Sequence, residues 1–198
     1  NYLYSLIGVF NKKMDGASEA FHAGSYPLAE DYIRQARRIA LRLDSVEKVA
    51  LARRIEADIA AAQGSLAKAK ELYTETLKMR ETMGDDRSLP ALQEALGDLE
   101  TRTGDFKNAE IHLKKSLAGF RREKDPGGIA MAYRGLGSLA FERGQLNEAS
   151  LMFASAMGAL QGRGPDMVKD IEARQALVLR ERGRFDDAKR VLQACLDY

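Results

Sequence analysis

The segment of this chain that comes nearest to a chemical motif is the glycine-rich stretch around residue 135. Gly135-Leu-Gly137-Ser-Leu-Ala140 matches the dinucleotide-binding pattern by letter, in which glycines let the backbone approach a pyrophosphate. That pattern must follow a strand and open a helix. Here the segment falls inside an expected helix, so we interpret Gly137 as a close-packing position and expect no nucleotide cofactor.

The nucleophilic and metal-ligating side chains are too dispersed for a catalytic or zinc site. His22 and His112 are the only histidines, and the single cysteine, Cys195, allows neither an intramolecular disulfide nor a cysteine-based metal cluster. A zinc site or a catalytic triad would need several such groups to converge, and nothing in the sequence indicates that they do. We therefore expect no catalytic residue, no metal, no cofactor and no enzymatic activity.

One pair of carboxylates has the spacing of neighbours on a helix. Glu94 and Asp98 are four residues apart and would lie on one face, where they could bind a hard cation. Two carboxylates on a helix are more commonly part of a solvated polar face. We favour the polar face.

The composition is that of an all-α protein without a strong charge. Hydrophobic residues make up 45% of the 198 residues, prolines number only 4, and Ala, Leu, Glu, Lys and Arg are abundant. The 31 basic residues nearly balance the 29 acidic ones, which gives a formal net charge of +2. A nucleic-acid partner is therefore not indicated, because no basic footprint is present.

The first ten residues are the longest apolar stretch of the chain, and they are too short to span a membrane. We expect them to form an amphipathic helix that packs on the first repeat, although the tail of a removed leader stays an alternative. Because the chain begins at Asn1 rather than Met, we interpret it as a processed protein or as part of a longer one. The cysteine content favours a cytoplasmic location and leaves an exported form open.

A six-residue pattern, Gly-x-[Tyr/Leu/Phe]-x-x-Ala, recurs five times along the chain. Successive glycines are 40, 40, 40 and 39 residues apart, which is enough for two helices and their turns. The five glycines are Gly24, Gly64, Gly104, Gly144 and Gly183.

Three further positions recur in the same register. A large apolar residue follows the alanine of the pattern by four residues: Ile33, Tyr73, Leu113, Phe153 and Leu192. A small residue follows it by seven: Ala36, Thr76, Ser116, Ala156 and Cys195. Another small residue precedes the glycine by seven: Ala17, Ala57, Gly97, Gly137 and Ala176. Because such spacings keep residues on one helix face, each unit is expected to be a close-packed helix pair, and Cys195 a buried structural thiol.

The repeat therefore predicts five antiparallel helix-turn-helix units, each ending its first helix at a glycine in the left-handed conformation. We place the N-caps at Ser45, Ser88 and Asp125. The helices are expected at 8–23, 26–42, 45–63, 66–83, 88–103, 106–122, 126–143, 146–161, 166–182 and 185–197. The repeats are expected at approximately 8–44, 45–84, 85–125, 126–164 and 165–198, within one domain spanning 1–198.

This arrangement resembles the tetratricopeptide repeat (TPR), and the segment from Tyr133 to Ala156 matches it best. The resemblance covers residues 11–198, with a unit of 40 residues instead of the usual ~34. Units of this length are similar to those of kinesin light chains, cell-polarity adaptors and some bacterial multidomain transcription regulators. The resemblance implies an all-α fold, namely a right-handed α-solenoid, or superhelix, whose first helices line a concave groove that binds a peptide or protein partner.

In TPR proteins, the positions ten and six residues before the turn glycine face the ligand. The matching residues here are Arg54 and Asp58, Glu94 and Asp98, and Arg134 and Ser138. The Lys/Asn clamp that some members use for a terminal carboxylate is absent from these positions. With Arg102 as a further cation and Phe141 as an apolar anchor, we expect a peptide of mixed charge, unless these charges simply pair along the helices.

Two alternatives concern the partner and the context. The last helix has no later helix to cover its apolar residues, which predicts either a homo-oligomer or a longer parent chain. Those residues are Phe185, Val191, Leu192, Cys195 and Leu196. A second hypothesis makes the array the ligand-sensing segment of a multidomain signalling or transcription regulator, binding a small molecule or a peptide signal.

Overall fold

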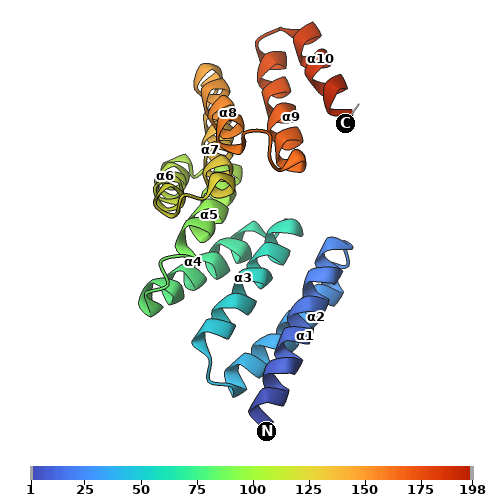
Figure 1. Ribbon diagram of the computed structural model, residues 1–198, viewed down its shortest axis with the longest axis vertical. Helices are drawn as coiled ribbons and strands as arrows, with labels where there is room; N and C mark the ends of the chain where they lie inside the picture. Colours follow the sequence, from blue (N-terminus) through green and yellow to red (C-terminus); the bar gives the residue numbers. More distant parts are fainter. Residues whose placement is uncertain (1, 197–198) are drawn as a thin grey trace. The chain divides into compact units, whose positions relative to one another are not determined.

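The computed structural model describes residues 2–196, and this part of the chain contains ten α-helices and no strand. In chain order the helices are α1 (Tyr2–His22), α2 (Tyr26–Arg42), α3 (Val46–Ala62), α4 (Leu66–Met83), α5 (Leu89–Thr103), α6 (Phe106–Glu123), α7 (Pro126–Glu142), α8 (Leu146–Leu160), α9 (Pro165–Glu181) and α10 (Phe185–Leu196) (Figure 1). The all-α solenoid of helix pairs is confirmed. Every predicted helix end within the described residues lies within one residue of the observed end, except the start of α1. The predicted end of the last helix, at 197, lies outside the described residues.

Helix α1 begins at Tyr2, so the apolar start of the chain is helical, but it does not pack as expected. Tyr2, Leu3 and Tyr4 are 72%, 61% and 77% exposed. The first side chain of α1 to be fully covered is that of Phe10. The expectation that residues 1–10 pack on the first repeat is therefore wrong for residues 2–4, whose side chains are mostly exposed.

The turns between paired helices have the conformation that the repeat predicts. The five turn glycines have φ angles between 72° and 80°, a region that L side chains enter only with strain. Ser45 caps α3 by accepting a hydrogen bond from the Lys48 amide, and Asp125 caps α7 by accepting one from the Gly127 amide. Ser88 precedes α5 but makes no capping hydrogen bond, because its backbone is already helical.

Glycines at the small-residue positions let paired helices approach closely. A Cβ placed on Gly97 would lie 2.5 Å from Cγ of Leu113, and one on Gly137 would lie 2.6 Å from Cε1 of Phe153. Both partners are the large apolar residues that recur four positions after the alanine. The close-packing interpretation of Gly137 is thereby confirmed, and it explains the letter match to a nucleotide motif.

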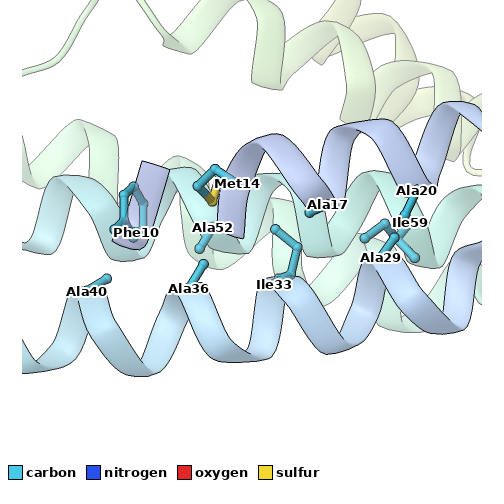
Figure 2. Close-up of a cluster of buried hydrophobic side chains, with 10 residues drawn as sticks. All are labelled: Phe10, Met14, Ala17, Ala20, Ala29, Ile33, Ala36, Ala40, Ala52 and Ile59. Atoms are coloured by element: carbon cyan, nitrogen blue, oxygen red, sulfur yellow. The ribbon is translucent and has the colours of Figure 1, made fainter. Parts of the chain in front are cut away.

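The chain divides into two compact units, residues 1–86 with α1–α4 and residues 87–198 with α5–α10. The first unit has a core drawn from α1, α2 and α3, in which alanines and two isoleucines fill the space between helices (Figure 2). Its members are Phe10, Met14, Ala17, Ala20, Ala29, Ile33, Ala36, Ala40, Ala52 and Ile59. The arrangement of both units in one domain spanning 1–198 stays a prediction.

The last helix is only partly covered. Phe185 is 66% exposed and Leu192 is 46% exposed, while Val191 is half-buried. Cys195 is also half-buried, so the expectation of a buried thiol is wrong: among the described residues, neighbouring helices cover this side of α10 only in part. Leu196 lies outside the described side chains.

Candidate partner-binding surfaces

The candidate residues lie on the first helices of the repeats and fall into two groups. Arg54 and Asp58 lie on α3 in the first unit. The other candidates belong to the second unit and lie on α5 and α7: Glu94, Asp98, Arg102, Arg134, Ser138 and Phe141. We describe each group within its own unit.

In the first unit, Arg54 is a half-buried cation with an incomplete set of partners. Its Nε is buried and has no hydrogen-bond partner in the described part of the chain. Asp58 lies one turn further along α3, and the charge of Arg54 acts to lower the pKa of its carboxyl. A guanidinium that loses hydration without gaining acceptors is less stable than a paired one.

Asp58 is held by a neighbour from the second helix of the repeat. The Tyr73 hydroxyl, on α4, donates a hydrogen bond to Oδ1 of Asp58. Burial raises the pKa of the Asp58 carboxyl above its ordinary value, and this outweighs the lowering by the Tyr73 hydrogen bond and the Arg54 charge. Burial therefore makes the charged form of the Asp58 carboxyl less favourable than it would be in water.

In the second unit, Arg134 on α7 lies between carboxylates from two other helices. Its Nη2 donates to Oε1 of Glu94 on α5 at 3.0 Å, and its Nη1 donates to Oδ2 of Asp170 on α9 at 3.3 Å. Glu94 is only 5% exposed, so this ion pair is largely shielded from water. Arg134 thus links three consecutive first helices.

Arg174 on α9 extends this contact. Its Nε donates to Oδ2 of Asp170 at 3.1 Å, and its Nη1 donates to Oγ of Ser138 at 3.0 Å. Ser138 in turn donates to the carbonyl oxygen of Arg134 at 3.1 Å. We call Glu94, Arg134, Asp170 and Arg174 the charge network. It joins α5, α7 and α9 through alternating charges.

The electrostatics of the network favour the charged form of its central residue. Burial by itself lowers the pKa of Arg134, but the carboxylates of Glu94, Asp170 and Asp98 together raise the pKa above its ordinary value. Asp98 therefore contributes through its charge. Glu94 and Arg134 pair with each other, but the pair joins two helices and Glu94 is buried, so it differs from the solvated pairing along one helix face that the alternative describes.

The remaining candidates differ in exposure. Arg102 is exposed near the end of α5. Phe141 is half-buried and packs against the buried cluster that contains Phe153 and Ile171. Part of the Phe141 ring therefore packs in the core, and the rest is exposed.

Sequence reasoning missed Asp170, Arg174 and a second buried pair. The last two turn glycines are 39 residues apart, so the residue equivalent to Arg134 in the fifth repeat is Ala173, and the repeat register did not point to its neighbour Arg174. In the other pair, Nδ1 of His112 lies 2.7 Å from Oε2 of Glu100, whose side chain is 2% exposed. Glu100 occupies the register position of buried alanines in the neighbouring repeats, which is the signal that could have revealed it.

Residues 2–196 contain neither a metal-binding cluster nor a membrane-spanning helix. No group of three or more His, Cys, Asp or Glu side chains in this range could hold a metal ion. No helix in the same range has the length and apolar content to cross a membrane.

Several solved structures share this fold at low sequence identity. BtubC (BKLC) from P. vanneervenii is 20% identical with a TM-score of 0.73, over 100% of this chain and 94% of that chain. A Rap protein complexed with Competence and Sporulation Factor is 16% identical with a TM-score of 0.85, over 96% of this chain. This chain spans 53% of the Rap protein. TPR-like repeats of a putative kinesin light chain from Podosopora anserina are 16% identical with a TM-score of 0.71, over 94% of this chain and 93% of that chain.

A comparison with curated protein sequences gave no match. The model of the MalT-like TPR region, in contrast, matches residues 16–196, which covers all five turn glycines and nine complete helices. The predicted resemblance to the tetratricopeptide repeat is confirmed. This chain belongs to the family of MalT-like TPR regions.

Proposed function

We propose that this chain is an interaction module that holds a peptide or protein partner against the first helices of its repeats. One observation carries the proposal: Arg54 presents a half-buried guanidinium whose Nε has no hydrogen-bond acceptor. The equivalent cation 40 residues later, Arg134, has two carboxylates. A partner carboxylate against the guanidinium of Arg54 would supply an opposing charge in addition to that of Asp58.

The surface of the second unit would contribute contacts of mixed charge. Asp98 attracts a basic side chain, and the exposed Arg102 attracts an acidic one. Glu94, Arg134 and Ser138 are engaged in or beside the charge network, so we propose that they shape the surface and exchange partners only when a ligand replaces an existing bond. The half-buried ring of Phe141 offers an apolar contact.

Related folds support a binding role. The Rap protein that shares this fold is complexed with Competence and Sporulation Factor. The described residues offer no converging metal ligands, and no catalytic role is proposed. The cytoplasmic location stays a prediction from composition.

The test is to select ligands from a random peptide library displayed on phage. The affinity of the chain for synthetic versions of the selected peptides is then measured. We expect the selected peptides to contain an acidic residue and Arg54→Glu to weaken their binding at least about tenfold, which corresponds to about 1.4 kcal/mol. Arg38→Glu, which makes the same charge change on an exposed residue of α2, should leave the affinity unchanged. Equal affinities for both variants would contradict the role of Arg54.

The second hypothesis is that the chain is the ligand-sensing segment of a multidomain regulator. In that case the same surfaces would bind a small molecule or a peptide signal. Titration with a panel of anionic metabolites, read by thermal denaturation, separates the two. A midpoint that rises with a metabolite and fails to rise in Arg54→Glu would favour the small-molecule ligand. A panel without any shift, together with selected peptides, would favour the peptide.

We further propose self-association through α10, where Phe185 and Leu192 remain exposed. Light scattering at increasing concentration should show a mass that grows for the unmodified chain and stays monomeric for the Phe185→Ser, Leu192→Ser variant. A monomer at all concentrations would exclude this contact.

A further inference from the structure

Two adjoining surface cavities of the first unit lie away from the residues considered so far. The larger, of about 510 Å³, is lined by Val46, Met79 and Met83 together with polar side chains of α3 and α4. The smaller, of about 230 Å³, shares Val46 and Met79 and adds Leu41 and Val49. We call these five apolar residues and the two cavities the methionine groove. It contains neither Arg54 nor Asp58.

The floor and rim of the methionine groove are apolar although they face water. Leu41 is 64% exposed, Val46 is 53% exposed and Met83 is 39% exposed. Three exposed large apolar side chains around one hollow form a patch of the kind that marks an interaction site. Met79 and Met83 lie one turn apart on α4, and their flexible thioethers can adapt to a partner surface.

The charges at the larger cavity are unbalanced. Arg53 and Glu75 pair with each other across the α3–α4 contact and so cancel. Lys78 also lines this cavity and is exposed. The larger cavity therefore carries the positive charge of Lys78 beside its apolar residues, whereas the smaller cavity is lined by the acidic Asp44. The Lys78 end of the groove complements an apolar segment with an adjacent carboxylate.

We propose that the methionine groove binds an amphipathic helix of a partner protein, with its apolar stripe on Met79 and Met83 and an acidic residue against Lys78. A helix presents apolar residues at i, i+3, i+4 and i+7 along one stripe, and such a stripe fits an elongated groove. The two joined cavities extend along the ends of α2, α3 and α4, so they offer more length than a single side chain needs. The site is separate from the Arg54 surface and does not depend on it.

The test uses a synthetic sixteen-residue helical peptide that has leucines along one face and glutamates beside them. The chain, labelled with ¹³C at its methionine methyl groups, is titrated with this peptide and followed by NMR. We expect the methyl signals of Met79 and Met83 to move, while the other five of the seven methionines stay in place as internal controls. A peptide of the same composition in scrambled order should move none of them.

Variants then test the two parts of the contact. Met83→Gln should weaken binding of the peptide at least fivefold. Lys78→Glu should weaken binding of the acidic peptide about tenfold and strengthen binding of a version with lysines in place of the glutamates. Lys107→Glu makes the same charge change on an exposed residue of α6 and should change neither affinity. Arg54→Glu should also leave this binding intact, which separates the result from that of the proposed function.

Three outcomes would overturn the proposal. Shifts spread over all seven methionines would indicate nonspecific binding, and unchanged affinity in both Met83→Gln and Lys78→Glu would place the peptide elsewhere. Methyl shifts of Met79 and Met83 that follow protein concentration without peptide would assign the groove to a second copy of the chain.

Discussion

Arg54 in the first unit and Arg134 in the second occupy the same position of the repeat, yet their surroundings differ. Arg134 has Glu94 on the helix before it and Asp170 on the helix after it. On the preceding helix of the first unit, the residue equivalent to Glu94 is Met14, which is buried and apolar. The same residue type in the same register is therefore part of a closed network in one unit, and in the other it has a buried Nε without a hydrogen-bond partner among the described residues.

The different surroundings of Arg54 and Arg134 show that a residue at one position of the repeat can have different roles in different repeats. In the second unit the arginine joins consecutive helices, because carboxylates within hydrogen-bond distance offset the burial of its charge. In the first unit the opposing charge that acts on Arg54 is that of Asp58 on the same helix, and we propose that this arginine is available to a ligand. The predictions below test whether this division between a stabilising and a binding arginine is real.

The largest effect is expected from removing the central cation of the charge network. Arg134→Met keeps the aliphatic stem but leaves Glu94 largely buried beside a neutral side chain, and we expect a loss of about 2 kcal/mol in the free energy of unfolding. Arg54→Met should change it by less than about 0.5 kcal/mol, because no buried carboxylate loses a bonded partner. Urea unfolding monitored by circular dichroism measures both. Equal losses of unfolding free energy in the two variants would contradict the distinction between a stabilising Arg134 and a ligand-binding Arg54.

The next effect concerns how closely paired helices pack. The first unit has alanines at the small-residue position, Ala17 and Ala57, whereas two of the three repeats of the second unit have glycines there, Gly97 and Gly137, and the last has Ala176. Gly137→Ala would press a methyl group against Phe153 and should cost about 1 to 2 kcal/mol in thermal or urea unfolding, even after the gain in helix propensity.

Gly158→Ala is the matched control for that variant. Gly158 lies inside α8 with nothing within 4 Å of an added Cβ, so alanine there should stabilise the chain by about 0.5 to 1 kcal/mol. If Gly137→Ala also stabilised the chain, the close approach of α7 and α8 would not limit the residue at this position.

A smaller effect is expected at the other small-residue position. Thr76 in the first unit is buried and donates its hydroxyl hydrogen to the Leu72 carbonyl at 2.7 Å. Ser116, its equivalent in the second unit, is fully buried, and its Oγ has no hydrogen-bond partner among the described residues. Ser116→Ala should therefore stabilise the chain by about 1 kcal/mol in urea unfolding. Ser155→Ala, a change at a more exposed site of α8, should be within about 0.5 kcal/mol of zero.

The smallest effect is expected at Asp58, and it depends on pH. Because the folded-state pKa of Asp58 is raised by burial, the folded chain binds more protons than the unfolded chain in the acidic range. The stability that protonation contributes is fully present below the ordinary aspartate pKa, about 3.9, and is lost as the pH rises through the folded-state pKa.

Asp58→Asn should remove this dependence. The variant is expected to match the unmodified chain below the ordinary aspartate pKa and to become the more stable of the two toward neutral pH, as measured by urea unfolding at a series of pH values. If the two proteins differed in stability by the same amount at every pH, burial would not disfavour the charged form of Asp58.

The fold was predictable in detail because its determinants are local and periodic. A glycine that can adopt positive φ ends each first helix, and the alternation of small and large residues places the two helices of a pair in contact. The exceptions occur where a terminal helix lacks a neighbour: Tyr2 to Tyr4 and Cys195 were expected to be covered and are not.

The sequence by itself therefore determined the five repeats, the helix boundaries and the residues of the helix contacts, since these follow from spacing along one chain and from backbone conformation. Only the tertiary structure decided that Arg134 is paired while Arg54 has an unsatisfied Nε, that Glu100 meets His112, and that a groove opens beside Met79. The physical reason is the length of charged and methionine side chains: each can reach several neighbours on other helices, and the backbone pattern does not choose among them.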